Sequence, residues 1–578
     1  MREAGAYTVT ASAGETVRRL QIAANATLSI TGGAFTAEAG TGAGANAGAI
    51  LIGEGARLVV GRALDNSGLI TLDTGGGVAE LLFNDDTTLS GGGHIDLGDG
   101  RANLLTGTSG NVVLTNVDNT LFGSGRLGSG RLTLLNRSRG VIDARGDQAL
   151  ILNTSGRVLY NDGLIEGTGA GGLTIKNTVV FNGYPVSDGV ILAADGSKVR
   201  LRGAAIFGGT LESTGSGKIV TGRAGVSRGF HNELDGRTYA VHNQAGLLVA
   251  DHTSLAIQGE IHNTGRITLG ARGHFADLIV NTSNATLTGG GSVRLRGDAG
   301  DRFYGAAATA TLTNVDNRIG GGGLLGHGVL TLVNQAGGVI VAGGASALII
   351  DTGTRTLVNA GIIKATGPGG GLITSAVDNT GTLKAAGGDL TVMGAVTGNG
   401  SATIRGATLA FGSNFTETVG FTGATGVLEL ARSQSYAGKI KGFSLTGGTS
   451  LGLRDIGFTG AGEASFSGDR HSGVLTVSDG IHTAHITLIA TIPARPSSPA
   501  TTARAGSSWP ARRRVRRPFR RSSRPWRSWA PAPEKRPTRR TRTPRPFPIW
   551  PSSAPTTLKE PAGPPNAHAV QNCHKIPL

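Results

Sequence analysis

Leu114-Thr115-Asn116-Val117-Asp118-Asn119 decides the fold, because the same six residues return at 312–317, after an offset of 198 residues. The ungapped alignment continues to residues 169 and 367, with 31 identities in 56 positions. An unbroken register of this length indicates that both copies, which extend over about 62–183 and 260–383, keep one backbone geometry. Repeats usually build extended scaffolds rather than catalytic pockets.

Short runs elsewhere in the chain alternate polar and apolar residues, as in 26–30, 69–72 and 132–134. This period of two is typical of strands that bury one face. Gly and Asn separate the runs every few residues, where a chain needs positive φ angles to turn. The pattern predicts many short strands joined by tight turns.

Asparagine recurs at intervals that match one coil of a solenoid, such as 25 residues from Asn334 to Asn359 and 20 more to Asn379. In such a coil, two or three short strands pair with the coils above and below. Asparagines at one corner would stack as a ladder of side-chain amides. We therefore predict an all-β, right-handed parallel β-helix (a β-solenoid) followed by a disordered tail. The structural repeat positions are Asn116, Asp118, Asn119, Asn136, Asn161, Asn314, Asp316, Asn317, Asn334 and Asn359.

The composition divides the chain at residue 489. Residues 1–489 hold 95 of the 97 Gly and a net charge of −1, whereas residues 490–578 hold 18 of the 20 Pro, all four Trp and a net charge of +17. We predict solenoid repeats over 1–420 and a β-rich module over 421–489 that caps or continues them. A disordered Arg/Pro-rich tail is predicted over 490–578.

We interpret the tail as a GC-rich gene read in a shifted frame, which yields Arg, Pro, Ala, Ser and Trp in excess. A genuine disordered basic tail and a nucleic-acid-binding segment are the alternatives, since clustered Arg neutralises phosphates. The basic charge lies outside the repeats, so we expect no nucleic-acid partner.

The order of the repeated motifs carries a resemblance. Leu-Thr-Asn-Val-Asp-Asn, a Gly-rich stretch, Leu-Thr-Leu-(Leu/Val)-Asn and Gly-Val-Ile-x-Ala resemble the passenger repeats of bacterial autotransporter and filamentous-haemagglutinin-like adhesins. Residues 421–489 resemble a module often found after such repeats, so the resemblance covers roughly 5–489. It implies a non-enzymatic attachment protein of the bacterial cell surface, outer membrane or medium, with a host or cell-surface protein or glycan as its partner.

We expect a monomeric solenoid whose export signal is not in this chain. No span approaches the roughly 20 apolar residues of a membrane helix, so no transmembrane segment is predicted.

Several catalytic or metal-binding motifs have a simpler explanation. The Gly-x-Gly-x-x-Gly patterns at 123–128 and 321–326 precede strands, whereas a dinucleotide site needs a helix there. Gly448-x-Ser450-x-Gly452 lacks the strand-to-helix turn of a nucleophile elbow. The calcium-like run at 91–96, with Asp99 nearby, is a single copy, and His482-x-x-His485 lacks a third zinc ligand. We expect no catalytic residue, no cofactor and no metal.

Two Arg-Gly-Asp tripeptides are candidate receptor contacts, formed by Arg145, Gly146 and Asp147 and by Arg296, Gly297 and Asp298. In an adhesin, the Asp of this tripeptide would meet the metal of an integrin and the Arg an acidic pocket. The first copy is not retained at the aligned positions 343–345, and Gly and Asp also suit the corners of a solenoid.

Two other readings stay open. One is a polysaccharide-active β-helix enzyme, a lyase or hydrolase, which would need carboxylates converging on one face. The other is a non-functional remnant of a larger surface protein. A face with convergent carboxylates would favour the enzyme, and a smooth face of Thr, Asn and Ser would favour the adhesin.

Overall fold

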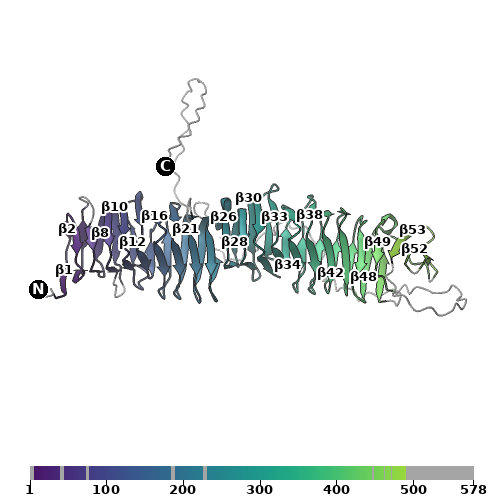
Figure 1. Ribbon diagram of the computed structural model, residues 1–578, viewed down its shortest axis with the longest axis horizontal. Helices are drawn as coiled ribbons and strands as arrows, with labels where there is room; N and C mark the ends of the chain where they lie inside the picture. Colours follow the sequence, from purple (N-terminus) through teal and green to yellow (C-terminus); the bar gives the residue numbers. More distant parts are fainter. Residues whose placement is uncertain are drawn as a thin grey trace, which may run out of the picture. The chain divides into compact units, whose positions relative to one another are not determined.

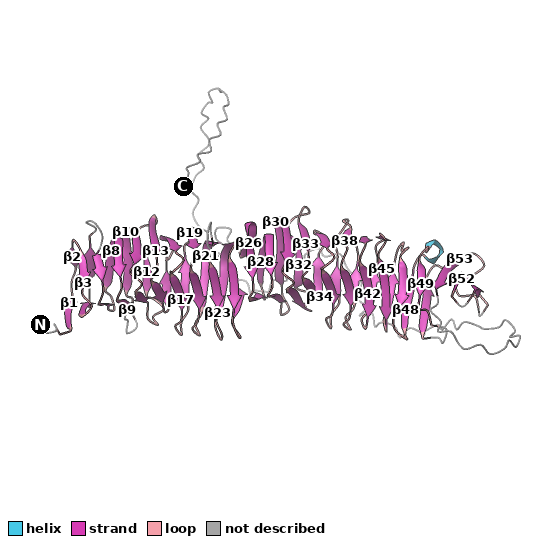
Figure 2. Ribbon diagram, viewed as in Figure 1, coloured by secondary structure: helices cyan, strands magenta, loops and turns pink. Residues whose placement is uncertain are grey.

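The computed structural model describes residues 5–489 apart from 39–43, 73–76, 184–188, 225–230, 445–447, 461 and 470. These residues belong to one of two compact units of the chain, Met1–Arg512. The predicted tail lies outside the described residues. The described part contains 53 strands and one short 3-10 helix, η1 (Ser433–Ser435), as Figure 2 shows. No helix in this part is long and apolar enough to span a membrane.

Consecutive coils stack through parallel strand pairs. One coil contains β14 (Thr120–Phe122), β15 (Gly125–Leu127) and β16 (Leu132–Asn136). The next contains β17 (Val141–Ala144), β18 (Leu150–Asn153) and β19 (Val158–Asn161). Each strand pairs in parallel with the strand three places later, so the coils form three sheets. We call them sheet 1 (through β14 and β17), sheet 2 (through β15 and β18) and sheet 3 (through β16 and β19).

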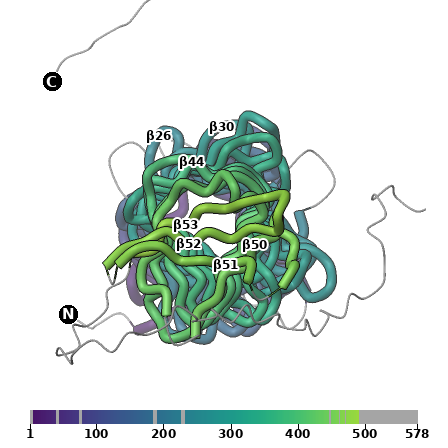
Figure 3. Tube along the Cα trace, turned by 90° about the vertical axis from the view of Figure 1, so that its right-hand side faces the viewer, coloured from purple at the N-terminus to yellow at the C-terminus, as the bar shows by residue number. Residues whose placement is uncertain are grey.

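About 18 such coils follow one another along the described unit (Figure 1), and an end-on view shows them superimposed around one axis (Figure 3). The predicted β-solenoid is confirmed.

The core is a narrow column of aliphatic side chains. In sheet 1, Ile142 of β17, Ile165 of β20 (Leu164–Gly167) and Ile191 of β22 (Val190–Ala193) lie on neighbouring coils, and all three are fully buried. Because strand side chains alternate between the two faces, every second residue enters this column and its neighbours face outward. The alternation read from the sequence therefore fills the core without a single tryptophan in the described part.

Glycine makes the corners between sheets. Gly123 has φ 112°, and Gly321, its counterpart 198 residues on, has φ 127°. A Cβ atom at Gly321 would collide with the carbonyl oxygen of Leu295. Strand β15 contains Gly125, the second glycine of the first Gly-x-Gly-x-x-Gly pattern, and strand β34 (Arg318–Gly326) contains all three glycines of the second, so neither pattern starts a helix. All six glycines have positive φ, so both patterns are bends of the backbone between sheets.

The strand pairing changes from parallel to antiparallel near residue 464. Residues 421–489 first continue the parallel coils through β48 (Gly426–Leu430), β49 (Lys439–Lys441) and β50 (Thr449–Leu453). Strands β51 (Ala464–Gly468), β52 (Ser472–Ser478) and β53 (Thr483–Ile489) then form an antiparallel meander. Strand β53 pairs in parallel with β49, so the meander covers an open edge of the last coils.

Candidate functional site

The corner asparagines form a buried row of hydrogen-bonded amides. Asn116 donates its Nδ2 to Oδ1 of Asn136 over 2.9 Å, Asn136 donates to Asn161 over 2.9 Å, and Asn161 donates to Asn182 over 2.7 Å. Asn119 belongs to the same row, because its backbone N–H donates to Oδ1 of Asn116. These side chains are fully buried, so they hold adjacent coils together and are not surface groups. We call this row, which begins at Asn46, the first ladder.

A second ladder serves the later coils. It begins at Asn243, which donates to Asn263, and Asn263 donates to Asn317. The remaining members, Asn314, Asn334, Asn359 and Asn379, are linked at 2.7–2.8 Å, and Asn379 finally donates to Oε2 of Glu417. The repeated aspartates lie in the turns beside these rows, where Asp118 accepts from the N–H of Gly92 and Asp316 from that of Gly290.

The two ladders occupy different corners of the solenoid. Strand β13 (Val112–Asn116) pairs with β16, so the first ladder ends the strands of sheet 3. Strand β33 (Thr311–Asn314), its counterpart in the repeat, pairs with the second half of β30 (Ala276–Thr288), which is in register with sheet 1. The 198-residue repeat is therefore rotated by one sheet about the axis.

The first Arg-Gly-Asp tripeptide follows β17. The guanidinium of Arg145 lies 3.1 Å from the ring centroid of Phe122, and the backbone N–H of Asp147 donates to Asp99. Gly146 is buried, and a Cβ there would collide with Ser124 and Asp99. The arginine is thus folded onto Phe122 of the preceding coil, and the backbone at Gly146 is packed against that coil.

The second tripeptide is held by its own backbone bonds. Oδ1 and Oδ2 of Asp298 accept the N–H groups of Gly300 and Gly273, at 2.9 and 2.8 Å. These backbone hydrogen bonds lower the pKa of Asp298. The backbone N–H groups of Arg296 and Gly297 donate to Asp301, so the whole turn is fixed. The carboxylate that would have to bind a receptor is already engaged within the turn.

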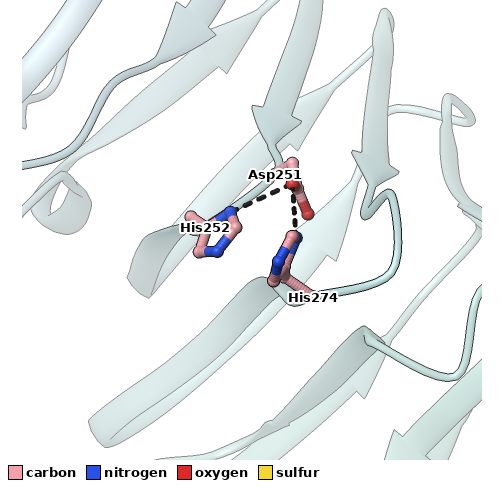
Figure 4. Close-up of side chains that lie close together, drawn as sticks. All are labelled: Asp251, His252 and His274. Atoms are coloured by element: carbon pink, nitrogen blue, oxygen red, sulfur yellow. Dashed lines mark hydrogen bonds and ion pairs between the residues drawn. The ribbon is translucent and has the colours of Figure 1, made fainter. Parts of the chain in front are cut away.

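Three side chains that the sequence analysis did not single out converge on successive turns (Figure 4). Asp251 and His252 lie between β27 (Gly246–Ala250) and β28 (Thr253–Asn263), and His274 lies one coil later, after β29 (Arg266–Gly270). Oδ2 of Asp251 is 3.0 Å from Nδ1 of His252 and 3.0 Å from Nδ1 of His274. The three candidate ligand atoms all lie within 4.8 Å of one another.

Backbone hydrogen bonds hold Asp251 and His252 in place. The other oxygen of Asp251, Oδ1, accepts the N–H of Arg272 at 2.9 Å, and this bond, helped by both histidines, lowers the pKa of Asp251 to about 2. His252 has φ 59°, a conformation that non-glycine residues rarely adopt, and its N–H donates to the carbonyl of Phe275. The two imidazole rings lie 3.5 Å apart between centroids. The aspartate is a fixed anion with two imidazole nitrogens directed at it.

The sequence signal for this cluster is weak. Asp251 and His274 are 23 residues apart. This spacing places them on adjacent coils only if the coil between them has that length, and the sequence alone does not give the length. Of the motifs weighed from sequence, His482 contacts Asp479 and His485 contacts Thr476, and these two partners are different. In the calcium-like segment, Asp96 accepts from Gly98, and Asp99 accepts from Ser124 and Asp147. Neither segment gathers a ligand set.

Two half-buried carboxyl groups lie side by side on sheet 1. Asp143 of β17 and Glu166 of β20 are neighbours in the register of sheet 1. Burial raises the pKa of Asp143, against the effects of a hydrogen bond from Thr168 and the charge of Arg145. Burial and the charge of Asp143 raise the pKa of Glu166. These are two half-buried acidic groups on one face of the solenoid.

The fold and these sites define a parallel β-solenoid protein. No protein-family model matches the chain, and no matching curated protein or solved structure was found.

Proposed function

We propose that the chain is the solenoid part of a bacterial surface or secreted adhesin, which binds a host or cell-surface protein or glycan through its outer faces. The observation that carries this proposal is that the two copies of the 198-residue repeat agree at buried positions and differ at outward-facing charged positions. Buried positions such as Leu134 and Asn136 are identical in the second copy, at 332 and 334. The outward charges Arg137 and Arg139 become Gln and Gly at 335 and 337.

A charge that is retained supports the same pattern. Arg157 recurs as Arg355, and both side chains donate to a backbone carbonyl of the preceding coil, that of Gly130 or Gly328. A charge is therefore kept where it holds the scaffold and changed where it faces solvent. A rigid scaffold with a variable surface suits attachment, because recognition is then set by outward residues that folding does not constrain.

Binding by the full-length chain tests the proposal. Fluorescently labelled protein is applied to a glycan array and to cultured host cells, and saturable binding is expected. The double variant Asp143→Asn/Glu166→Gln should bind as the wild type does, because the proposed role needs no acid or base. Absence of saturable binding on every surface would contradict attachment.

The Asp143–Glu166 pair favours a second candidate, a polysaccharide-cleaving enzyme. Glycoside hydrolysis uses two carboxyl groups flanking the scissile bond, one of them with a raised pKa so that it can act as an acid. Incubation with acidic and neutral polysaccharides, followed by assay of reducing ends and of unsaturated products, tests this function. Turnover that the same double variant abolishes would establish the enzyme and displace the adhesin.

A further inference from the structure

We propose that Asp251, His252 and His274 form a binding site for one divalent transition-metal ion, with Zn²⁺ as the ion of choice. The inference does not depend on the adhesive function, because it follows from the side chains of two neighbouring turns. Among the described residues, this is the group of histidine and carboxylate side chains whose ligand atoms converge.

The distances fit a small tetrahedral ion. Zinc binds imidazole nitrogen and carboxylate oxygen at about 2.0–2.2 Å, so two ligands of a tetrahedral site lie about 3.3–3.6 Å apart. Oδ2 of Asp251 lies 3.0 Å from each imidazole Nδ1, close to this spacing. An ion that replaced the shared protons would need only a small outward movement of the rings. The rings of His252 and His274 lie against each other at a tilt of 39°, and the Nδ1 atoms of both are directed at the same carboxylate oxygen.

The chemistry of the donors selects the class of ion. Imidazole nitrogen with one carboxylate oxygen suits Zn²⁺ and its transition-metal neighbours, whereas Ca²⁺ takes six to eight oxygen ligands and Mg²⁺ an octahedral set. Oδ1 of Asp251 is held by the N–H of Arg272, which leaves Oδ2 as the coordinating atom. Three protein ligands leave a fourth position for water or an external donor.

The surroundings support binding of a cation. Asp298, on the coil after His274, accepts the N–H of Gly273 at 2.8 Å, so a second carboxylate lies beside the cluster. His252 has an unfavourable positive φ, and this backbone conformation places its side chain beside Asp251. A bound ion would join the turn after β27 to the turn after β29 and so link two consecutive coils.

Isothermal titration of the full-length, chelator-treated chain with ZnCl₂ tests the site. We expect one equivalent of Zn²⁺ to bind, and CaCl₂ to give no saturable heat. The variant His252→Gln/His274→Gln should lose this binding. A matched control is His242→Gln/His262→Gln, a histidine pair also one coil apart, with rings 5.2 Å apart, in which His262 contacts the hydroxyl of Thr288. The control variant should bind Zn²⁺ as the wild type does.

Two further measurements keep the test decisive. If circular dichroism shows that the double variant is misfolded, the single variant His274→Gln replaces it, since this side chain is 55% exposed. Its affinity for Zn²⁺ should fall at least about tenfold, because changes even outside the coordination shell reach that size. Zn²⁺ should also raise the melting temperature of the wild type and the control but not of the ligand variants. No saturable Zn²⁺ binding, or an equal loss in both histidine pairs, would overturn the proposal.

Discussion

Leu211 of β24 (Thr210–Ser213) lies beside Asn243 of β26 (Glu233–Asn243) on the next coil, and the second ladder begins at this step. Before it, this row of sheet 1 is aliphatic, and Ile191 and Leu211 are fully buried. After it, the row continues as Asn243 and Asn263. The first ladder has already ended, because Asn182 donates to the carbonyl of Thr210 and not to another asparagine.

The ladders predict that an interior asparagine matters more than a terminal one. Asn136→Ala would leave both the Nδ2 of Asn116 and the Oδ1 of Asn161 without their ladder partners. Asn46→Ala would remove the ladder partner of Asn66 alone, because within the described residues Oδ1 of Asn46 accepts no hydrogen bond. Each buried polar group left unpaired costs about 1–3 kcal/mol. Urea unfolding followed by circular dichroism should therefore show a larger loss for Asn136→Ala, and equal losses would contradict the ladder.

Glu417 predicts a pH dependence of stability. Burial raises its pKa from 4.5 to about 7, and the side chain is 4% exposed. Below about pH 4.5 the carboxyl is protonated in both the folded and the unfolded chain. Between pH 4.5 and 7 only the folded chain keeps the proton, so this group lowers stability as the pH rises, and above pH 7 the loss is constant. The full loss is about 3 kcal/mol, at 1.36 kcal/mol for each pKa unit.

The variant Glu417→Gln isolates this effect, because glutamine keeps an oxygen for the amide of Asn379 and carries no charge. Its free energy of unfolding should match that of the wild type near pH 4 and exceed it by up to about 3 kcal/mol at pH 8. Denaturant titrations at several pH values measure the difference. A difference that did not change with pH would show that Glu417 does not titrate in this range.

A buried ion pair should contribute more than a surface pair. Arg302 forms two hydrogen bonds to Asp277, at 2.7 and 2.6 Å, and Asp277 is 4% exposed. Arg302→Ala would leave that carboxylate buried without its cation, at a cost of about 3–5 kcal/mol. Arg57→Ala, which breaks the exposed pair with Glu80, should cost less than about 1 kcal/mol. Unfolding midpoints in urea would distinguish the two, and similar values would contradict the assigned burial.

Attachment should not depend on the Arg-Gly-Asp tripeptides. Gly146 is buried beneath Ser124, and both carboxylate oxygens of Asp298 are bonded to backbone N–H groups. The variants Asp147→Glu and Asp298→Glu, assayed for binding to integrin-bearing cells, should bind as the wild type does. A severalfold loss with either variant would establish the tripeptide as a receptor contact despite this geometry.

The sequence predicted the coils well because their signals are local. Alternation placed the strands, and the spacing of Asn334, Asn359 and Asn379 matched the amide row that the structure shows. The rotation between the two copies could not be predicted, because an alignment compares positions along the chain and carries no information about the angle around the axis. The asparagine row changes corner between Asn182 and Asn243, outside the aligned segments.

The cluster of Asp251, His252 and His274 could not be predicted either, because it too depends on how the coils stack. Asp251 and His274 become neighbours only after the coil between them closes with a particular length. His482 and His485 are close in sequence and resemble a pair of zinc ligands, yet their side chains contact different partners. In a solenoid, a ligand cluster is formed by residues at the same position of adjacent coils, and closeness along the chain does not predict it.

The gap between the two ladders has a consequence for cooperativity. In a stack where each coil contacts only its neighbours, stability is a sum of local terms, and unfolding spreads until it meets a weak junction. Among the described residues, the junction between Asn182 and Asn243 lacks the asparagine-to-asparagine bond that links neighbouring coils on either side, and Oδ1 of Asn243 accepts no hydrogen bond there. We expect the amino-terminal and carboxy-terminal coils to melt as two blocks, so that one can unravel while the other stays folded.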